Sequence, residues 1–209
     1  MIPRYQTILF SILLVASLAM GVVLWQLRER AHQRMMAGQD SAPTHAPVVA
    51  PAEQATLVVA IDADNTLLEQ VRSLPLPADP GARARAVLGK LLELYATPDS
   101  PHLAPGGPNS VAQVFLLPAE GDKDPKNPDA QLAVVNLTGS FAASHPSGLE
   151  TESLTVLSIC GTLHANLPRV TQVRFLVDGV QHQTLAGHAD LTRTYLAASA
   201  TPTAEGARP

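Results

Sequence analysis

The sequence is short of the residue types on which several classes of protein depend. Its single cysteine, Cys160, excludes an internal disulfide and any metal site built from several cysteines. Lys and Arg together number only 14 in 209 residues, and no basic stripe with interleaved aromatic residues is present, so we do not expect binding to nucleic acid phosphates. The sequence also lacks a glycine-rich phosphate loop and a G-x-S-x-G nucleophile elbow.

Charged residues are missing from one long stretch near the N-terminus. Thr7 to Trp25 reads TILFSILLVASLAMGVVLW and, as a helix rising about 1.5 Å per residue, is long enough for the roughly 30 Å hydrocarbon core of a bilayer. Such a helix satisfies its own backbone hydrogen bonds in lipid. A cleaved signal peptide would have a shorter apolar region and a small-x-small cleavage site. The sequence therefore predicts a retained single-pass anchor, with a helix over about residues 7–27.

The charges around this stretch leave its orientation open. One arginine precedes it and three follow it: Arg4, then Arg28, Arg30 and Arg34. The positive-inside rule, read literally, places the C-terminal part in the cytoplasm, but that rule weakens for large translocated domains. These four arginines against Glu29 give residues 1–34 a charge of +3, and because the whole chain carries −4, residues 35–209 carry −7.

Composition divides the chain into four parts. Residues 1–34 hold the anchor and its flank. Residues 35–54 are rich in Pro, Ala, Ser and Gln without periodicity, which is typical of a flexible linker. The folded domain is expected over residues 55–196, because a chain of about 140 residues buries enough of its surface to fold alone. Residues 197–209 share the composition of the linker and are interpreted as a disordered tail.

Periodic patterns within residues 55–196 predict alternating strands and helices. Strands are expected at six apolar or alternating runs: Thr56–Ile61, Thr66–Leu74, Val111–Leu117, Leu132–Leu137, Val173–Val177 and Val180–Leu185. One helix follows Asp79, the expected N-cap, and runs to about Tyr95. A second follows Ser147, whose spacing to Glu150 indicates a capping box, and Pro168 stops it.

The last two predicted strands are separated by the strongest turn signal in the chain. Asp178-Gly179 is typical of a type I′ hairpin, so we expect Val173–Val177 and Val180–Leu185 to pair. The expected fold class is α/β of an α+β-like kind: a mixed, mainly antiparallel sheet with two amphipathic helices packed on one face, in addition to the N-terminal transmembrane helix. The other face of the sheet would stay partly open to solvent or to a partner.

Three residues near the C-terminus are the best metal-ligating candidates: His182, His188 and Asp190. A zinc site needs three or four converging ligands with supporting groups around them. His182 lies on a predicted strand, the other two follow in a loop, and no fourth ligand is evident. These positions therefore favour structural roles, such as hydrogen bonds that fix the local backbone after the last strand.

Two other groupings of reactive residues have simpler interpretations. Cys160 and His164 share a helix face at i, i+4 spacing, which could give a cysteine nucleophile its base, but the apolar stripe around Cys160 favours a core position. Asp62, Asp64 and Asn65 resemble half of a calcium loop that lacks the required Gly and distal Glu, and are interpreted as a plain turn.

The charged stretch Glu120 to Asp129 is interpreted as a solvated hairpin loop, with a docking surface as the alternative. We therefore assign no catalytic, cofactor-binding or metal-binding residue.

Four sequence patches occur one after another in the second half of the chain. They are VVNLTGSF (134–141) followed by PSG (146–148), LTVLSI (154–159) with TL (162–163), LPRV (167–170) leading into VRFLVDG (173–179), and TLAGHADL (184–191). In order and spacing they resemble the GerM-type domain, also written GerMN, of sporulation and spore-germination proteins. Residues 56–117 match more weakly. The chain departs from that family in Asn136, where Asp is commoner, and in the 119–130 loop, which looks like an insertion.

The resemblance implies an extracytoplasmic domain without catalysis, similar to the ring-building modules of envelope complexes, and it favours the outward orientation. The resulting hypothesis is a non-enzymatic, membrane-anchored interaction domain that helps to assemble or stabilise a cell-envelope protein complex related to sporulation or germination. It would lie at the cytoplasmic (inner) membrane, with envelope proteins or a second copy as partners and with no nucleic acid, cofactor or small-molecule substrate. The alternative is a membrane-tethered cell-wall hydrolase or metal-dependent enzyme using His182, His188 and Asp190.

Overall fold

The structure is a computed structural model that describes residues 13–14, 17–18, 20–22, 25, 52–119 and 128–197. It divides into two units, Met1–Val48 and Val49–Pro209, which are described separately. In the first unit the described residues are helical, and their large apolar side chains, such as Trp25, are exposed. None of the helices formed by described residues is both long and apolar enough to cross a bilayer. Most of the expected anchor, linker and tail lies outside the described residues.

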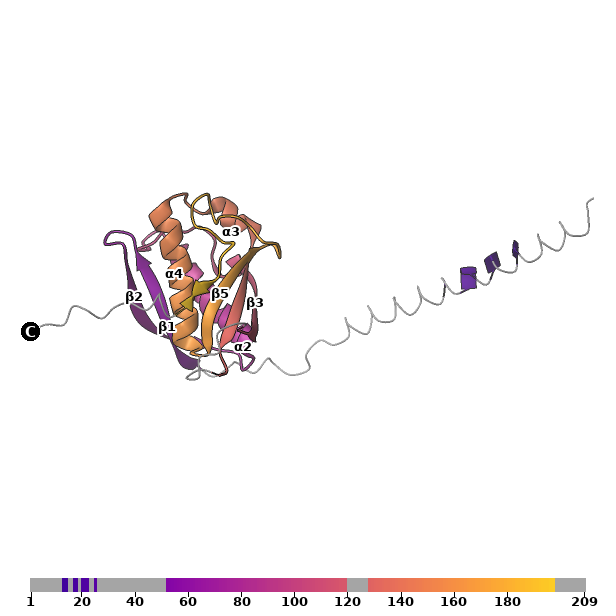
Figure 1. Cartoon of the computed structure of the whole chain (residues 1–209), viewed down its shortest axis with the longest axis horizontal. Coiled ribbons are helices and arrows are strands. Elements are labelled where there is room, and N and C mark those ends of the chain that lie inside the picture. The colour runs from indigo at the N-terminus through magenta and orange to yellow at the C-terminus, as the bar shows by residue number, and fades with distance from the viewer. Residues whose placement is uncertain are drawn as a thin grey trace, which may run out of the picture. The chain divides into compact units, whose positions relative to one another are not determined.

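The second unit alternates strands and helices in an order close to the prediction (Figure 1). Its strands are β1 Ala52–Ile61, β2 Thr66–Pro75, β3 Val111–Pro118, β4 Gln131–Leu137, β5 Val170–Val177 and β6 Tyr195–Leu196. Its helices are α2 Pro80–Tyr95, the 3-10 turn η1 Pro108–Ser110, α3 Gly139–Ser144 and α4 Leu149–Asn166. The expected α+β class, with mixed strands and helices, is confirmed, whereas α3 was not predicted.

The described strands form two sheets instead of the single sheet that we predicted. β1 and β2 make an antiparallel hairpin, and the other four strands form a sheet in the order β3-β4-β5-β6. Within that sheet β4 and β5 are parallel, while β3–β4 and β5–β6 are antiparallel. The parallel pair arises because α3 and α4 lie between β4 and β5 in the sequence and return the chain to the same end of the sheet.

Helix α4 lies between the two sheets (Figure 1). Helix α4 packs against β1 and β5, and α2 packs against β3, β1 and α4. Helix α4 is therefore buried on its polar side as well, where Thr155, Ser158 and Thr162 are all 0% exposed. This corrects the prediction of two amphipathic helices on one sheet face. The predicted apolar stripe, with Cys160 and Leu163 at 1% exposure or less, is present, but it accounts for only part of the buried surface.

The polar side of α4 is buried because it closes the free edge of β1. Three alternate backbone N–H groups of this edge donate to helix side chains: Thr56 to Asn166 Oδ1 at 3.0 Å, Val58 to Thr162 Oγ1 at 2.8 Å, and Ala60 to the Tyr95 hydroxyl at 2.8 Å. Asn166 also donates from Nδ2 to the Thr56 carbonyl at 2.6 Å. An edge whose polar groups are occupied in this way cannot pair with a further strand.

The two predicted helix starts have different outcomes. Asp79 is the N-cap of α2, and its Oδ2 accepts a hydrogen bond from the Ala82 N–H at 2.7 Å, as the sequence predicted. The predicted capping box at the start of α4 is wrong, because the N-cap residue is Gly148 and no N-cap side chain accepts a hydrogen bond from the first turn. Glu152, one turn into the helix, reaches back instead and accepts a hydrogen bond from the Gly148 N–H at 3.2 Å.

The predicted hairpin after β5 is half right. Asp178 and Gly179 both have positive φ, 50° and 79°, as a type I′ turn requires, and Val177 bridges to Val180. The chain from 180 to 185 does not continue as a strand, however. The edge of β5 is occupied by β6, which pairs with Gln172 and Val173, so the predicted partner strand is wrong.

Candidate functional site

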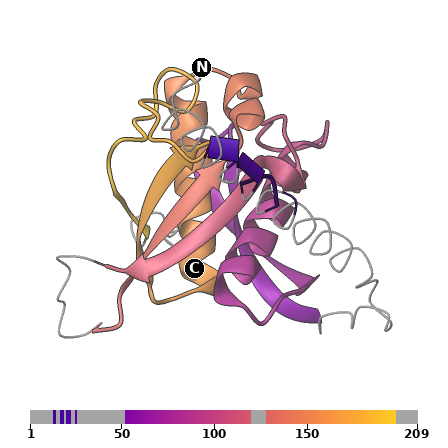
Figure 2. The ribbon, with the colours of Figure 1, turned by 90° about the vertical axis from the view of Figure 1, so that its right-hand side faces the viewer.

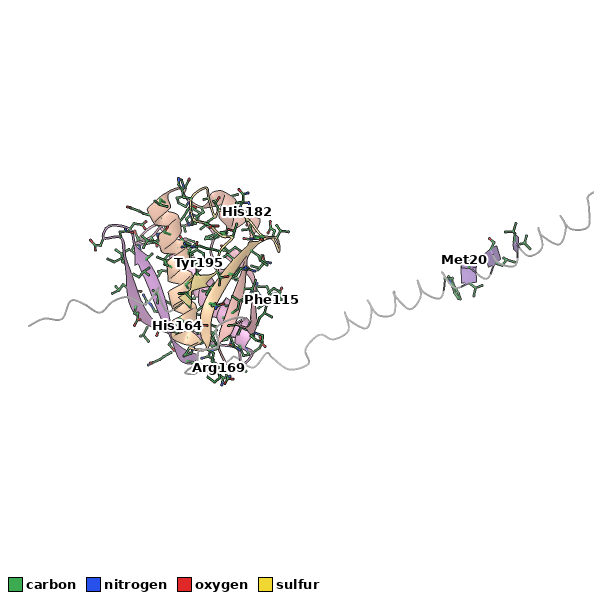
Figure 3. All side chains as sticks on the ribbon, in the orientation of Figure 1. Met20, Phe115, His164, Arg169, His182 and Tyr195 are labelled. Atoms are coloured by element: carbon green, nitrogen blue, oxygen red, sulfur yellow. The ribbon has the colours of Figure 1, made fainter. Side chains whose placement is uncertain are left out.

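The face of the four-stranded sheet that points away from the helices is open and partly apolar. Cross-strand register pairs Phe115 with Val134 and Leu117 with Leu132 on this face. Phe115 is 43% exposed and Leu117 48% exposed, in contrast to the buried side chains of the inner face. Figure 2 looks onto these strands, and Figure 3 labels Phe115 on the outer side of β3. We call Phe115, Leu117, Leu132, Val134 and Leu176 the outer sheet face.

Polar residues on β5 border the outer sheet face. Arg174 lies opposite Val134, and Gln172 lies opposite Leu132, so an apolar centre is flanked by one cation and an amide. Exposed apolar residues gathered on one surface and bordered by polar groups are typical of protein interaction sites. Strand β3 lies at the edge of this sheet, which makes its exposed side chains accessible from the side as well as from the front.

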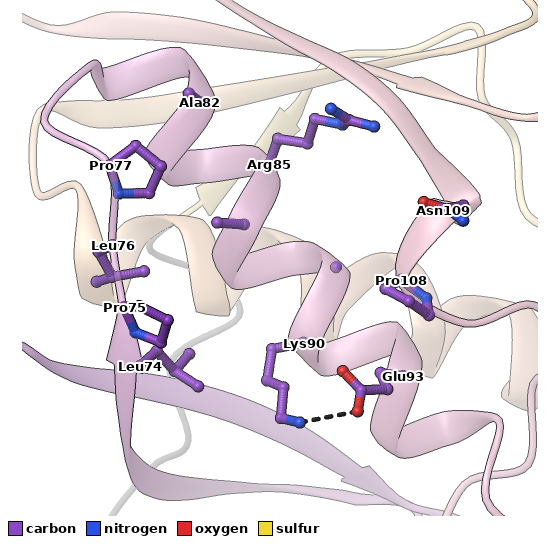
Figure 4. Close-up of a pocket in the computed structure, with 12 residues that line it drawn as sticks. Leu74, Pro75, Leu76, Pro77, Ala82, Arg85, Lys90, Glu93, Pro108 and Asn109 are labelled. Atoms are coloured by element: carbon purple, nitrogen blue, oxygen red, sulfur yellow. Dashed lines mark hydrogen bonds and ion pairs between the residues drawn. The ribbon is translucent and has the colours of Figure 1, made fainter. Parts of the chain in front are cut away.

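A groove separates the end of β2 from α2 (Figure 4). This groove has a volume of about 560 Å³. Buried Leu74 and Leu76 line one wall, and α2 lines the other with small residues that include Gly89. At its border Lys90 Nζ and Glu93 Oε1 form an ion pair at 2.9 Å, seen in Figure 4. The groove is thus an apolar cleft with an already paired charge at its rim.

A buried carboxylate organises the loop that follows β5. Glu152 is 0% exposed, and its Oε2 accepts hydrogen bonds from the backbone N–H groups of Ala186, His188 and Ala189 at 2.8 to 3.0 Å. Burial alone raises the pKa of Glu152, but these amides and the His188 side chain outweigh it and lower the pKa to about 2. The carboxylate therefore stays ionised and holds the loop against the start of α4.

The metal candidates named from the sequence do not converge. His182 Nδ1 lies 2.6 Å from the Thr184 carbonyl, and Asp190 Oδ1 accepts hydrogen bonds from Thr192 at 2.8 Å (N–H) and 2.6 Å (hydroxyl). His188 is bound to Glu152 instead. Nowhere in the described part of the chain do three His, Cys, Asp or Glu side chains gather as a metal ion would require. Each candidate therefore has a structural hydrogen bond, as the sequence interpretation favoured for this loop.

The helix pair Cys160 and His164 also has structural partners. Cys160 is fully buried in the core, and burial strongly raises the pKa of its thiol, which opposes formation of a nucleophilic thiolate. His164 lies at the helix end, where its Nδ1 is 2.9 Å from the Val170 carbonyl. The arrangement gives Cys160 no features of a catalytic nucleophile.

One end of the domain holds a buried polar cluster that was not predicted from the sequence. The turn that holds Asp62, Asp64 and Asn65 forms as predicted, but Asp62 Oδ1 lies 2.5 Å from Nδ1 of the buried His102. His102 Nε2 and His145 Nε2 each lie 2.7 Å from the hydroxyl oxygen of Thr155. His102 follows an irregular segment that contains prolines, and His145 directly follows the short helix α3, so no sequence signal indicated that they meet.

Most of the charged loop between β3 and β4, residues 120–127, lies outside the described residues, and its docking role is untested. Its base is closed by the Ala119 N–H, which donates to the Ala130 carbonyl at 3.0 Å. This bond extends the β3–β4 hairpin by one pair and is consistent with a loop between two antiparallel strands.

These features define a small α+β domain in which two sheets pack against the longer helices, the histidines and acids considered above are held in structural hydrogen bonds, and Cys160 is buried in the core. The chain belongs to the Germane family, described as sporulation and spore germination, whose model matches residues 58–183. The GerM-type resemblance seen in the sequence is thereby confirmed.

Three solved structures are similar to this chain at low sequence identity. The first GerMN domain of the sporulation protein GerM from Bacillus subtilis is 15% identical, with a TM-score of 0.40, over 66% of this chain and 92% of that one. The tandem GerMN domains of the same protein are 15% identical, with a TM-score of 0.45, over 75% and 50%. A putative lipoprotein from Clostridium perfringens is 19% identical, with a TM-score of 0.33, over 73% and 93%. No curated protein matches the chain.

Proposed function

We propose that this chain is a membrane-anchored, extracytoplasmic interaction domain that helps to assemble or stabilise a protein complex at the cell envelope. Membership of the sporulation and spore-germination family supports a role in one of those processes. The domain acts by binding and not by catalysis, in keeping with families of GerM-type domains, which are not known as enzymes. The uncharged stretch from Thr7 to Trp25 supports the anchor, because its length fits a bilayer core.

The outer sheet face is the observation that carries the interaction role. Phe115 is 43% exposed and Leu117 is 48% exposed, although the burial of large apolar side chains is energetically favourable. Burying such a patch is what stabilises association with another protein. Strand addition at the edge of β3 is limited by Pro118 at its end and by the bulge between Val111 and Gln113, so we expect docking on the face itself.

The segment between the anchor and β1 sets how far the domain can act. β1 begins at Ala52, a few residues earlier than predicted, so residues 35–51, 17 in number, separate it from the flank of the anchor. A flexible chain of that length spans roughly 25 Å. Partners within such a distance of the bilayer, including membrane proteins and further copies of this chain, are therefore within reach.

Site-specific photo-crosslinking in intact cells tests this proposal. A photoreactive amino acid replaces Phe115 on the outer sheet face, and a matched variant carries it at Val71, which is apolar and 62% exposed on β2. We expect a discrete crosslinked product from position 115, with an envelope protein or a second copy, and none of that mass from position 71. Absence of product at 115, or identical products at both positions, contradicts the outer sheet face as the interface.

Paired substitutions give an independent readout of the same surface. Phe115→Glu and Leu117→Glu place charges on exposed positions and should leave the circular dichroism spectrum unchanged, while the crosslinked or co-purified complex is lost. Val71→Glu is the matched control and should leave the complex intact. Retention of the complex by both outer-face variants would show that the partner binds elsewhere.

A further inference from the structure

Four hydrogen bonds in a row cross one end of the domain. Asp62 Oδ1 is 2.5 Å from His102 Nδ1, and His102 Nε2 is 2.7 Å from Thr155 Oγ1. Thr155 Oγ1 is 2.7 Å from His145 Nε2, and His145 Nδ1 is 2.8 Å from the Pro146 carbonyl oxygen. The row joins the β1–β2 turn, the segment before η1, helix α4 and the segment after α3.

Water cannot replace these partners, because the middle of the row is closed to solvent. His102 and Thr155 are 0% exposed and His145 is 5% exposed, whereas Asp62 at the outer end is 42% exposed. A buried polar atom that loses its hydrogen-bond partner in such a place destabilises the fold. The protons for these four hydrogen bonds must therefore come from the side chains of the row itself.

A count of those protons shows a shortage. Each hydrogen bond needs one proton between its two heavy atoms, and both ends of the row, an ionised carboxylate and a backbone carbonyl, can only accept. Between the ends, neutral His102, Thr155 and neutral His145 supply one proton each. Four bonds therefore have three protons. The Thr155 hydroxyl also lies 3.1 Å from the Thr151 carbonyl, and a proton spent there would increase the shortage.

We propose that Asp62, His102, Thr155 and His145 form a proton-binding site that holds one proton more than its neutral histidines and hydroxyl supply, and that this proton completes the packing of this end of the domain. The proton links four chain segments that come from different parts of the sequence. The inference is independent of the proposed interaction role, because it concerns what the folded domain binds within itself.

The geometry places the extra proton between Asp62 and His102. The Pro146 carbonyl requires a proton on His145 Nδ1, and burial lowers the pKa of His145, which opposes a second proton on its Nε2. His145 Nε2 then accepts from the Thr155 hydroxyl, whose oxygen in turn accepts from His102 Nε2. His102 Nδ1 is left facing the Asp62 carboxylate, where one proton shared by the pair makes its net charge zero.

The other titratable groups around the row keep their charge state between pH 6 and 9. The Tyr95 ring packs edge-on against His102, with centroids 4.6 Å apart, and burial raises the pKa of Tyr95 to about 12. Glu152, on the same helix as Thr155, has a pKa of about 2 and stays ionised. The centroids of the two histidine rings are 6.4 Å apart, so a charge on His102 opposes one on His145. Asp62 is the acidic partner in direct contact with the row.

The consequence is a dependence of stability on pH with a definite sign. A histidine in the unfolded chain releases its proton near pH 6.5, at about its reference pKa. Above that pH the folded domain holds one proton more than the unfolded chain, so the unfolding equilibrium constant rises about tenfold per pH unit until the folded site releases its own proton. The stabilisation that this one proton contributes is therefore complete below about pH 6.5 and is lost as the pH rises.

The substitution Asp62→Asn tests the proton count directly. An Asn amide donates to His102 Nδ1, so the row then has four protons for four bonds with every group neutral. Urea unfolding of the full chain in a mild detergent, followed by circular dichroism from pH 6 to 9, should show one fewer proton released on unfolding for Asp62→Asn than for the natural chain. The control His182→Asn removes an exposed histidine outside the row. It should release as many protons on unfolding as the natural chain does, apart from those of His182 itself.

Nitrogen NMR of the histidine rings of the natural chain gives a second measurement that does not depend on a variant. At pH 7.5 we expect one of two states. Either both ring nitrogens of His102 are protonated, or its Nδ1 is unprotonated and accepts a hydrogen bond from a protonated Asp62. The proposal is overturned if His102 is neutral while Asp62 is ionised at that pH. It is equally overturned if Asp62→Asn folds and unfolds with the same pH dependence as the natural chain.

Discussion

Glu152 holds His188 at two points: Oε2 accepts the His188 backbone N–H at 2.9 Å, and Oε1 lies 3.0 Å from its ring Nδ1. The first residue lies in the opening turn of α4, and the second lies in the loop that follows β5. Because this loop has almost no regular secondary structure, the carboxylate takes over the task that a strand ladder performs elsewhere. The Glu152 contacts therefore fix the loop that follows β5 to helix α4.

Replacing Glu152 by Gln should destabilise the domain by about 2–4 kcal/mol. An amide keeps one acceptor oxygen, so its NH₂ group must face N–H donors that previously bonded to the second carboxylate oxygen. Chemical denaturation of the full chain measures the change. Glu150→Gln, at an exposed position in the same helical turn, is the matched control and should change the stability by less than about 0.5 kcal/mol. Equal effects of both substitutions would remove the central role given to Glu152.

The same carboxylate predicts loss of stability in acid. Its pKa is lowered to about 2 in the folded domain, compared with about 4.3 for a Glu in an unfolded chain. The stabilisation, on the order of 3 kcal/mol, is present above the unfolded value and is lost as the pH falls from about 4.5 towards 2. The lowered pKa of Asp190 acts in the same direction. The measurement is thermal unfolding against pH, in which Glu152→Gln should lose less stability than the natural chain.

Thr162→Val tests how the free edge of β1 is closed. The valine keeps the shape of the side chain but removes the acceptor of the Val58 N–H, which then stays buried without a partner, at a cost of about 1–3 kcal/mol. Thr171→Val is the opposite case, because the Thr171 hydroxyl is buried and has no hydrogen-bond partner in the described part of the chain. We expect that change to be neutral or stabilising by up to about 1 kcal/mol. Similar losses for both variants would contradict the role of Thr162.

The sequence predicted best those elements whose residues are set by local chemistry. Helix α2 begins at the predicted cap, Asp79, and the Asp178-Gly179 turn forms, because each depends on residues a few positions apart. The burial of Thr155 and Thr162 could not be read from periodicity, since hydroxyl residues on a helix look like a solvent-facing side. Their partners, His102 and Val58, are 53 and 104 residues away in the sequence.

The same distance in sequence limited what could be said of the candidate site. The outer sheet face depends on register between β3, β4 and β5, and the sequence indicated only that one sheet face would stay open. The second sheet was missed because β1 and β2 alone read like any other hairpin in a larger sheet. The predicted strand after Gly179 failed because Tyr195 and Leu196, with no strand signal of their own, occupy the edge of β5.

We propose that the domain is tethered to the outer side of the membrane, and a topology reporter tests this most directly. Alkaline phosphatase fused after Pro209 of the full chain folds into an active enzyme only outside the cytoplasm, while a fused cytoplasmic reporter gives the complementary signal. We expect high phosphatase activity in the membrane fraction and no signal from the cytoplasmic reporter. Activity of the cytoplasmic reporter alone, or recovery of the intact chain from the aqueous fraction, would contradict it.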